Sequence, residues 1–120
     1  MWQTELSEQA VADLSSIFDH LFASHLQFGH ERQKAAALAR DRVREISAQR
    51  ARISTAPFRG TVHLIRGRQL RHVTIKRTIY WFKIDEEKRI VSIEAIFFGG
   101  QDHFSRMSAR LRSMESGEAD

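Results

Sequence analysis

Residues 70–98 read LRHVTIKRTIYWFKIDEEKRIVSIEAIFF, and this stretch decides the class of fold. It is rich in Val, Ile, Thr and aromatic residues, which are enriched in β-strands. The polar run DEEKR at residues 85–89 divides it into two strands, residues 70–84 and 90–98, joined by a turn. A shorter strand at residues 61–65 comes just before. The second half of the chain therefore predicts an antiparallel meander.

The first half of the chain has the spacing of helices instead. Ser7 is a residue type favoured at helix N-caps, and apolar residues then recur at helical spacing: Ala10, Val11, Leu14, Ile17, Phe18, Leu21 and Phe22. Gly29 interrupts this pattern, and a second stripe follows at Ala35, Ala36, Ala39, Val43, Ile46 and Ile53. Pro57 cannot continue a helix. We therefore expect a helical hairpin that ends by Pro57, with small side chains that let its two helices approach closely.

A last helix is expected near the C-terminus. Phe104, Met107, Leu111 and Met114 have helical spacing, and the polar residues 115–120 after them are expected to form a flexible tail. A short strand at residues 2–5 precedes the helical hairpin. The sequence thus predicts one α+β domain over residues 1–114, in which an N-terminal strand and a helical hairpin pack on a curled antiparallel sheet, followed by a short C-terminal helix.

The distribution of charge points to an acidic partner. No Asp or Glu occurs from residue 46 to residue 84, although this run carries nine basic residues: Arg50, Arg52, Arg59, Arg66, Arg68, Arg71, Lys76, Arg77 and Lys83. Cations without local counter-charges create a positive field, which attracts polyanions or acidic protein segments. We therefore expect the partner to be negatively charged.

Composition excludes several classes of function. The chain has no cysteine, so a disulfide framework, a thiolate nucleophile and a Cys-based zinc site are ruled out. It also lacks a phosphate-binding glycine loop and a nucleophile elbow. Its N-terminal residues lack the basic region and apolar stretch of a signal peptide, and no apolar run approaches the roughly 20 residues that span a bilayer. We expect a cytoplasmic protein with no membrane partner.

Several short motifs, taken in order, resemble the RelE/ParE toxin superfamily over about residues 2–112. They are Leu6-Ser7-Glu8-Gln9-Ala10 and Asp13-Leu14 at the start, Pro57-Phe58-Arg59-Gly60 in the middle, Leu70-Arg71, and the aromatic-rich hairpin that ends near Asp102. The resemblance implies the toxin of a bacterial type II toxin–antitoxin module of the plasmid-stabilisation type, which arrests growth until a cognate antitoxin neutralises it. The implied antitoxin folds an acidic, amphipathic C-terminal segment around the toxin.

The superfamily contains two kinds of toxin. RelE-like members are metal-independent endoribonucleases that cut messenger RNA on the ribosome, with cations and often His or Tyr on the open face of the sheet. The resemblance places Ile79 where these nucleases keep an arginine, and a second cationic position falls on Gly99, Gly100 or Gln101. ParE-like members inhibit DNA gyrase without cleaving RNA. The sequence therefore favours a ParE-like gyrase inhibitor over a ribosome-dependent nuclease.

If the chain is a nuclease, the candidate catalytic residues are Tyr80, His103 and Arg106. His103 has the right chemistry for a general base that deprotonates an RNA 2′-hydroxyl, with Tyr80 or Arg106 as helper. Alternatively, Asp102 caps the last helix, and His103 is a surface residue in its first turn. A basic RNA-binding module without catalysis is a third class of function.

Alternation along the strands predicts the partner-binding face. Taken as one strand, residues 70–84 place Ile79 and Trp81 on one face, and the helical hairpin can cover only one side of the sheet. Unless the C-terminal helix covers the other side, Ile79 and Trp81 form an apolar patch with a basic rim, which suits a partner with apolar anchors and acidic flanks. The expected partner-binding residues are Arg71, Arg77, Ile79, Trp81, Lys83 and Phe98.

Neither a metal site nor a cofactor is expected. His20, His25 and His30 have near-helical spacing, but Gly29 breaks the helix and no acidic third ligand is evident. The basic residues of the second helix are interleaved with acids, as on a solvated face. No aromatic residues are interleaved with them to stack bases, so that helix is not expected to bind single strands.

Overall fold

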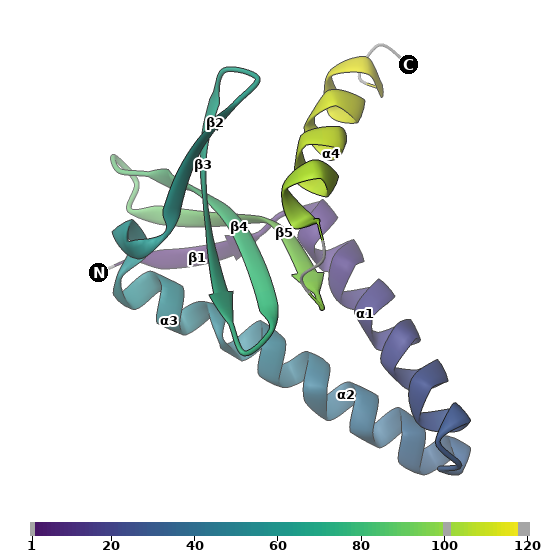
Figure 1. Ribbon diagram of the computed structural model, residues 1–120. Coiled ribbons are helices and arrows are strands. Elements are labelled where there is room, and N and C mark those ends of the chain that lie inside the picture. The colour runs from purple at the N-terminus through teal and green to yellow at the C-terminus, as the bar shows by residue number, and fades with distance from the viewer. Residues whose placement is uncertain (1, 100–101, 118–120) are drawn as a thin grey trace.

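The computed structural model describes residues 2–99 and 102–117, and it places helices on both faces of one five-stranded sheet (Figure 1). The elements are β1 (Gln3–Leu6), α1 (Glu8–Gln27), α2 (Arg32–Ala48), α3 (Arg50–Thr55), the 3-10 helix η1 (Pro57–Arg59), β2 (Thr61–Ile65), β3 (Arg68–Ile75), β4 (Thr78–Asp85), β5 (Ile90–Phe98) and α4 (His103–Gly117). This order confirms the predicted α+β architecture of strand, helical hairpin, meander and C-terminal helix.

The helical hairpin forms where the periodicity predicts it. Ser7 caps α1, because its side chain accepts a hydrogen bond from the Ala10 N–H at 3.1 Å. Gly29 turns the chain after α1 with a φ of +98°, a conformation that glycine adopts at little cost. Ala35 and Ala39 of α2 are completely buried, and their small side chains allow α1 and α2 to pack closely.

The sheet is mixed rather than purely antiparallel, which corrects the prediction. Its strand order is β1-β5-β4-β3-β2. Strands β2 to β5 form the expected antiparallel meander, but β1 runs parallel to β5, with Gln3 opposite Ile90 and Leu6 opposite Ile93. A parallel neighbour needs a long connection, and here the helical hairpin and the rest of the meander separate β1 from β5.

The stretch of residues 70–84, which the sequence predicts as one strand, is divided by a two-residue turn at Lys76 and Arg77. Both residues have a positive φ, 48° and 69°, as the favoured two-residue hairpin turns require. β3 and β4 therefore fold back on each other, with His72 opposite Trp81. The predicted assignment of faces over residues 70–84 is therefore wrong. His72 and Trp81 lie on the same face of the sheet, whereas in a single continuous strand they would point to opposite faces.

Apolar side chains on both sides of the sheet form a core on each face, and a bulge in β5 brings Val91 and Ile93 onto the same face as Ile96. Trp81 pairs with Ala95 whereas Phe82 pairs with Ile93, so Glu94 is an extra residue and the alternation of β5 shifts there. One core joins the sheet to the helical hairpin and contains Ala10, Ile17, Ile46, Ile53, Tyr80, Phe82, Val91, Ile93 and Ile96. The other joins the sheet to α4 and contains Ile65, Leu70, Ile79, Trp81, Ala95, Phe97, Met107 and Leu111.

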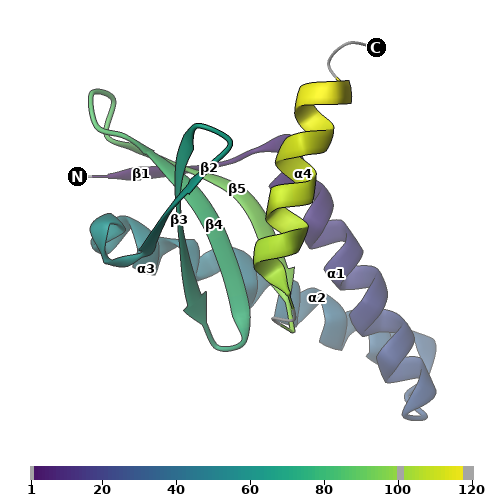
Figure 2. The ribbon, with the colours of Figure 1, turned by 45° about the horizontal axis from the view of Figure 1, so that its top comes forward.

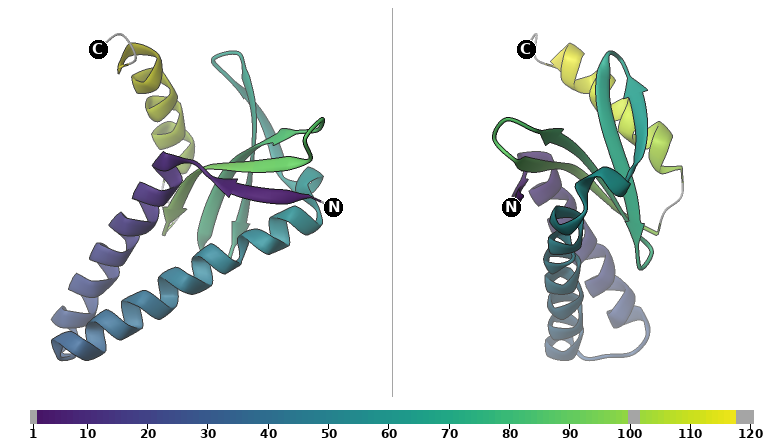
Figure 3. Two further views of the ribbon diagram at one scale, coloured as in Figure 1. Left: turned by 180° about the vertical axis from the view of Figure 1, so that it is seen from behind. Right: turned by 90° about the vertical axis from the view of Figure 1, so that its left-hand side faces the viewer.

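The two cores hold the helices on opposite faces of the sheet, as Figure 2 and Figure 3 show. The far end of the α1–α2 hairpin projects well beyond the sheet. Helix α4 continues to Gly117, so it includes the first residues of the segment that the sequence assigned to a flexible tail from residue 115. Within the described ranges, no helix has both the length and the apolar character that crossing a membrane requires.

Candidate functional site

The apolar patch expected at Ile79 and Trp81 is covered by α4. These side chains are 4% and 0% exposed, and they pack in one core with Met107 and Leu111 of that helix. The C-terminal helix thus covers this face of the sheet. The exposed apolar patch that was expected if the helix lay elsewhere is therefore not present. A partner reaches Ile79 or Trp81 only if α4 moves.

The basic residues predicted around this patch have different surroundings. Arg71 is held in place, because its Nη1 donates to the carbonyl oxygens of Phe58 at 3.2 Å and Gly60 at 3.3 Å. Its guanidinium also lies 5.2 Å from the centroid of the Phe58 ring. Arg77 in the β3–β4 turn and Lys83 on β4 are exposed. Arg77 and Lys83 therefore present their charge to solvent, whereas Arg71 also stabilises the entry to β2.

Phe98 lies on the opposite face of the sheet from Ile79 and Trp81. It is half-buried, packs against the core under the helical hairpin, and lies 5.3 Å from the Arg42 guanidinium by its ring centroid. The register of the ladder explains this placement, because Phe98 lies opposite Thr78 whereas Ala95 lies opposite Trp81, and strand residues an odd number of positions apart point to opposite faces. The structure therefore does not bring Phe98 together with the other predicted binding residues.

A groove of about 710 Å³ lies beside Arg71 and Lys83. Its lining also includes Arg68 of β3 and Leu111 of α4. Two of the six residues predicted to bind a partner thus meet at one concave surface.

Three histidines that are far apart in the sequence meet over Trp81. His63 comes from β2, His72 from β3, and His103 from the first turn of α4. His63 Nε2 lies 2.9 Å from His72 Nδ1, and the ring centroids of His72 and His103 are 4.6 Å apart. The Trp81 ring lies 5.0 Å from that of His63 and 5.1 Å from that of His72. We call these three side chains the histidine cluster; sequence reasoning singled out only His103.

Hydrogen bonds decide which nitrogens of the histidine cluster carry protons. Trp81 Nε1 donates to His103 Nδ1 at 3.1 Å, so His103 keeps its proton on Nε2. The contact between His63 and His72 needs one N–H and one lone pair, so the pair cannot hold two positive charges in this geometry. Burial, with the charges of His103 and His63, lowers the pKa of His72, and burial is also the main cause that lowers the pKa of His103. His72 and His103 are therefore neutral near pH 7.

These same hydrogen bonds compete with metal binding at the histidine cluster. A cation would need the imidazole lone pairs that now accept the Trp81 N–H and join His63 to His72. Within residues 2–99 and 102–117, no group of three or more His, Cys, Asp or Glu side chains is arranged to hold a metal ion.

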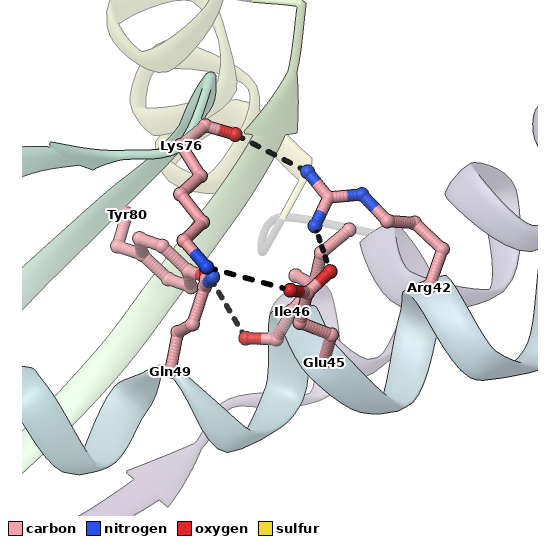
Figure 4. Close-up of polar contacts among 6 residues, drawn as sticks. All are labelled: Arg42, Glu45, Ile46, Gln49, Lys76 and Tyr80. Carbon is pink, nitrogen blue, oxygen red and sulfur yellow. Dashed lines mark hydrogen bonds and ion pairs between the residues drawn. The ribbon is translucent and has the colours of Figure 1, made fainter.

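Tyr80, one of the candidate catalytic residues, is completely buried against α2. Its hydroxyl donates to the Ile46 carbonyl oxygen at 2.7 Å and lies 2.9 Å from Gln49 Oε1 (Figure 4). Because a phenol has one proton, the Gln49 amide fits best with its NH2 group turned toward the Tyr80 oxygen. Burial raises the pKa of Tyr80 far above its usual range. Tyr80 therefore joins β4 to α2, and its burial argues against the catalytic role predicted for it.

The β3–β4 turn is tied to the same part of α2. Arg42 Nη2 donates to the Lys76 carbonyl oxygen at 3.2 Å, and Lys76 Nζ lies 3.6 Å from a carboxylate oxygen of Glu45 (Figure 4). Glu45 also pairs with Arg42, and this hydrogen bond lowers the pKa of its carboxyl group. The contacts hold the turn, and with it Arg77, beside the helical hairpin.

Arg106, the third candidate catalytic residue, is exposed on α4, and its guanidinium lies 4.3 Å from the centroid of the Phe97 ring. Its N–H donates to the Asp102 carbonyl oxygen at 3.1 Å. Asp102 has a φ of +50°, which differs from the extended geometry of the predicted N-cap. The resemblance places the second cationic position on Gly99, Gly100 or Gln101; Gly99 follows β5 with a φ of +89°, and residues 100 and 101 lie outside the described residues.

A helical hairpin on one face of a curled sheet and a C-terminal helix on the other define an α+β fold. The chain superposes with a TM-score of 0.61 on a chain of a solved structure described as "Chromosomal ParDE TA system from P. aeruginosa". The match covers 83% of this chain and 98% of that chain, at 18% sequence identity. No protein-family model matches the sequence, and no curated protein matches it. The structural likeness confirms the predicted ParE-like fold.

Proposed function

We propose that this chain is the toxin of a bacterial type II toxin–antitoxin module, and that a cognate antitoxin neutralises it in the cytoplasm. The observation that carries the proposal is the ParE-like fold, which matches 98% of a chain from a solved ParDE TA system. The acid-free run from residue 46 to residue 84 supports it, because the run forms β2, β3 and most of β4 and gives them a positive field. An acidic antitoxin segment is the partner that suits this surface.

The proposed target is DNA gyrase, inhibited by binding. Ile79 occupies the position at which the resemblance expects an arginine in RelE-like nucleases, and it is buried under α4. Tyr80 is buried on the other face. Charge stabilisation of a reacting phosphate needs accessible cations and proton donors, so these placements argue against a nuclease of that type. They do not weaken an inhibitor that only binds.

The six predicted partner-binding residues take three roles in this proposal. Arg77 and Lys83, which are exposed, contact the acidic partner directly. Ile79 and Trp81 pack against α4 and affect partner binding indirectly, by holding that helix in place. Arg71 and Phe98 hold the sheet edge and the hairpin face in shape.

A supercoiling assay tests the target. We expect the purified chain, added to gyrase and relaxed plasmid, to block supercoiling or to trap cleaved DNA. The variant with Arg77→Glu and Lys83→Glu should lose this inhibition, because long-range attraction to an acidic surface is reversed. The matched control carries Arg44→Glu and Arg52→Glu, the same charge change at exposed sites of α2 and α3, and should still inhibit. Equal loss in both variants would mean that only net charge matters.

The histidine cluster favours a second candidate function, a metal-independent messenger RNA endonuclease of the RelE type. The cluster contains His103, and imidazole is the side chain most often used for proton transfer in catalysis. Cleavage on programmed ribosomes, read out by primer extension, tests this function. Specific cleavage that disappears in His103→Ala or Arg106→Ala, together with no effect on gyrase at micromolar concentration, would replace the gyrase proposal.

A further inference from the structure

β3 and β4 pair along only part of their length. Their ladder ends at Arg71 opposite Phe82. Beyond that point β3 continues in its pairing with β2, and β4 continues in its pairing with β5. The two hairpins therefore diverge, as Figure 1 shows. We call the space between residues 68–70 and residues 83–85 the fork.

Two residues direct backbone hydrogen-bonding groups into the fork. In an antiparallel ladder, residues that exchange hydrogen bonds alternate with residues that do not. Counted from the two-residue turn at residues 76–77, Arg71 and Phe82 are a bonded pair. The direction of the backbone groups repeats at every second residue, so Gln69 and Ile84 face the same way, into the fork. Each therefore offers an N–H and a C=O to a further strand.

The groove of about 710 Å³ lies at the fork, and Gln69 and Ile84 both line it. Leu70 and Leu111 contribute apolar surface to the same groove, although each is almost completely buried. Phe58, which is 52% exposed, adds an aromatic ring. The fork thus combines backbone donors and acceptors with apolar contacts, as sites that bind an extended peptide do.

The charges around the groove favour an acidic peptide. Arg68, Arg71 and Lys83 line it, against two acids, Glu86 and Glu94. The Glu94 carboxylate accepts a hydrogen bond from the Ser92 hydroxyl at 2.6 Å, so part of its charge is already satisfied within β5. Peptide carboxylates are therefore attracted to the basic side of the groove.

We propose that the fork binds an extended, acidic peptide segment, which adds a strand between β3 and β4. Its backbone bonds Gln69 and Ile84, its apolar side chains contact Phe58 and the leucines of the groove, and its carboxylates meet Arg68 and Lys83. The proposal rests on the proposed toxin function in one respect, because the occupant it names is a segment of the antitoxin.

Amide hydrogen exchange in the isolated chain tests the fork without any partner. The Gln69 and Ile84 amides should exchange at least about tenfold faster than the Leu70 amide, which bonds β2. Slow exchange at both positions would mean that the fork is closed, and would overturn the proposal whatever the function of the chain.

Binding of synthetic peptides that tile the acidic segment of the neighbouring gene product tests the occupant. We expect one peptide to slow exchange at Gln69 and Ile84, and Arg68→Glu to weaken its affinity about tenfold by titration calorimetry. Arg52→Glu, an equal charge change at an exposed site on α3, should change the affinity far less. Binding without protection of the two amides, equal weakening by both substitutions, or no binding by any peptide would each overturn the proposal.

A separate experiment tests the proposed toxin function. The chain should arrest growth when it is expressed alone, and co-expression of its operon neighbour should restore growth. Growth arrest and rescue, combined with failure of the exchange or peptide-binding tests at the fork, would reject only the proposed peptide site. No arrest from a folded chain would reject the toxin function, even if the amides at the fork exchange as expected.

Discussion

The Nε1 of Trp81 donates a hydrogen bond to Nδ1 of His103 at 3.1 Å, and this bond joins the centre of the sheet to the first turn of α4. It fixes the tautomer of His103 and holds the histidine cluster against the indole ring. Because the two residues belong to different elements, the bond also helps to fix the position of α4 on the sheet. The position of α4 in turn decides whether Ile79 and Trp81 are accessible.

A double-mutant cycle should measure this relationship. Trp81→Phe keeps an aromatic ring but removes the N–H, and His103→Ala removes the acceptor. We expect a coupling free energy of about 1 kcal/mol between the two changes, the usual contribution of one hydrogen bond. Urea unfolding of the four proteins gives the value. Additive effects of the two substitutions would show that the bond contributes nothing to stability.

Stability should depend on pH through the histidine cluster. The pKa values of His72 and His103 are lower in the folded chain than the ordinary value of 6.5, so the unfolded chain binds more protons. The free energy of unfolding should therefore be highest above about pH 6.5 and fall as the pH decreases through the lowered folded-state pKa values. Urea unfolding at about pH 7.5, 6.5 and 5.5 measures it. His72→Gln should flatten this profile; an unchanged slope would assign the pH dependence to other groups.

Two ion pairs anchor α4, and they should differ in strength. The Asp13 carboxylate accepts both Arg110 amino groups at 2.8 Å and the Ile96 N–H at 2.9 Å, and the Asp13 and Arg110 side chains are only 13% and 21% exposed. Asp13→Ala should therefore lower the free energy of unfolding by about 1.5–3 kcal/mol. Glu115→Ala breaks an exposed pair with Arg66 and should cost far less. Equal losses in urea unfolding would contradict this ranking.

Gly60 should tolerate no side chain. A Cβ there would lie 3.1 Å from Arg71 Cβ, from the His72 carbonyl oxygen and from the Phe82 ring. Gly60→Ala should therefore destabilise the chain by about 1–3 kcal/mol, the typical cost of overpacking. Gly67→Asn is the matched control, because a Cβ at Gly67 meets no described atom within 4 Å and Asn accepts a φ near the observed +79°. Thermal unfolding that ranks the two variants the other way would contradict the close packing at Gly60.

Local signals in the sequence specify the class of fold and the outline of its elements. Helical spacing, the Ser7 cap and the turn at Gly29 are local signals, and each formed where it was predicted. The polar turn at residues 85–89 likewise separates two strands, as expected. The Lys76–Arg77 turn was missed because it lacks the Asn-Gly or Asp-Gly signal of such turns and lies within a continuous run of β-branched, aromatic and basic residues.

Contacts between distant segments determine which faces of the sheet are covered and which residues meet. The register between β4 and β5 places Phe98 on the opposite face from Trp81, and α4 buries Trp81, although neither feature can be read from the local pattern of one strand. His63, His72 and His103 come together because β2 pairs with β3 and α4 packs on that face of the sheet. The physical reason is that period and propensity act over a few neighbouring residues, whereas register and the docking of a helix depend on contacts between segments far apart in the chain.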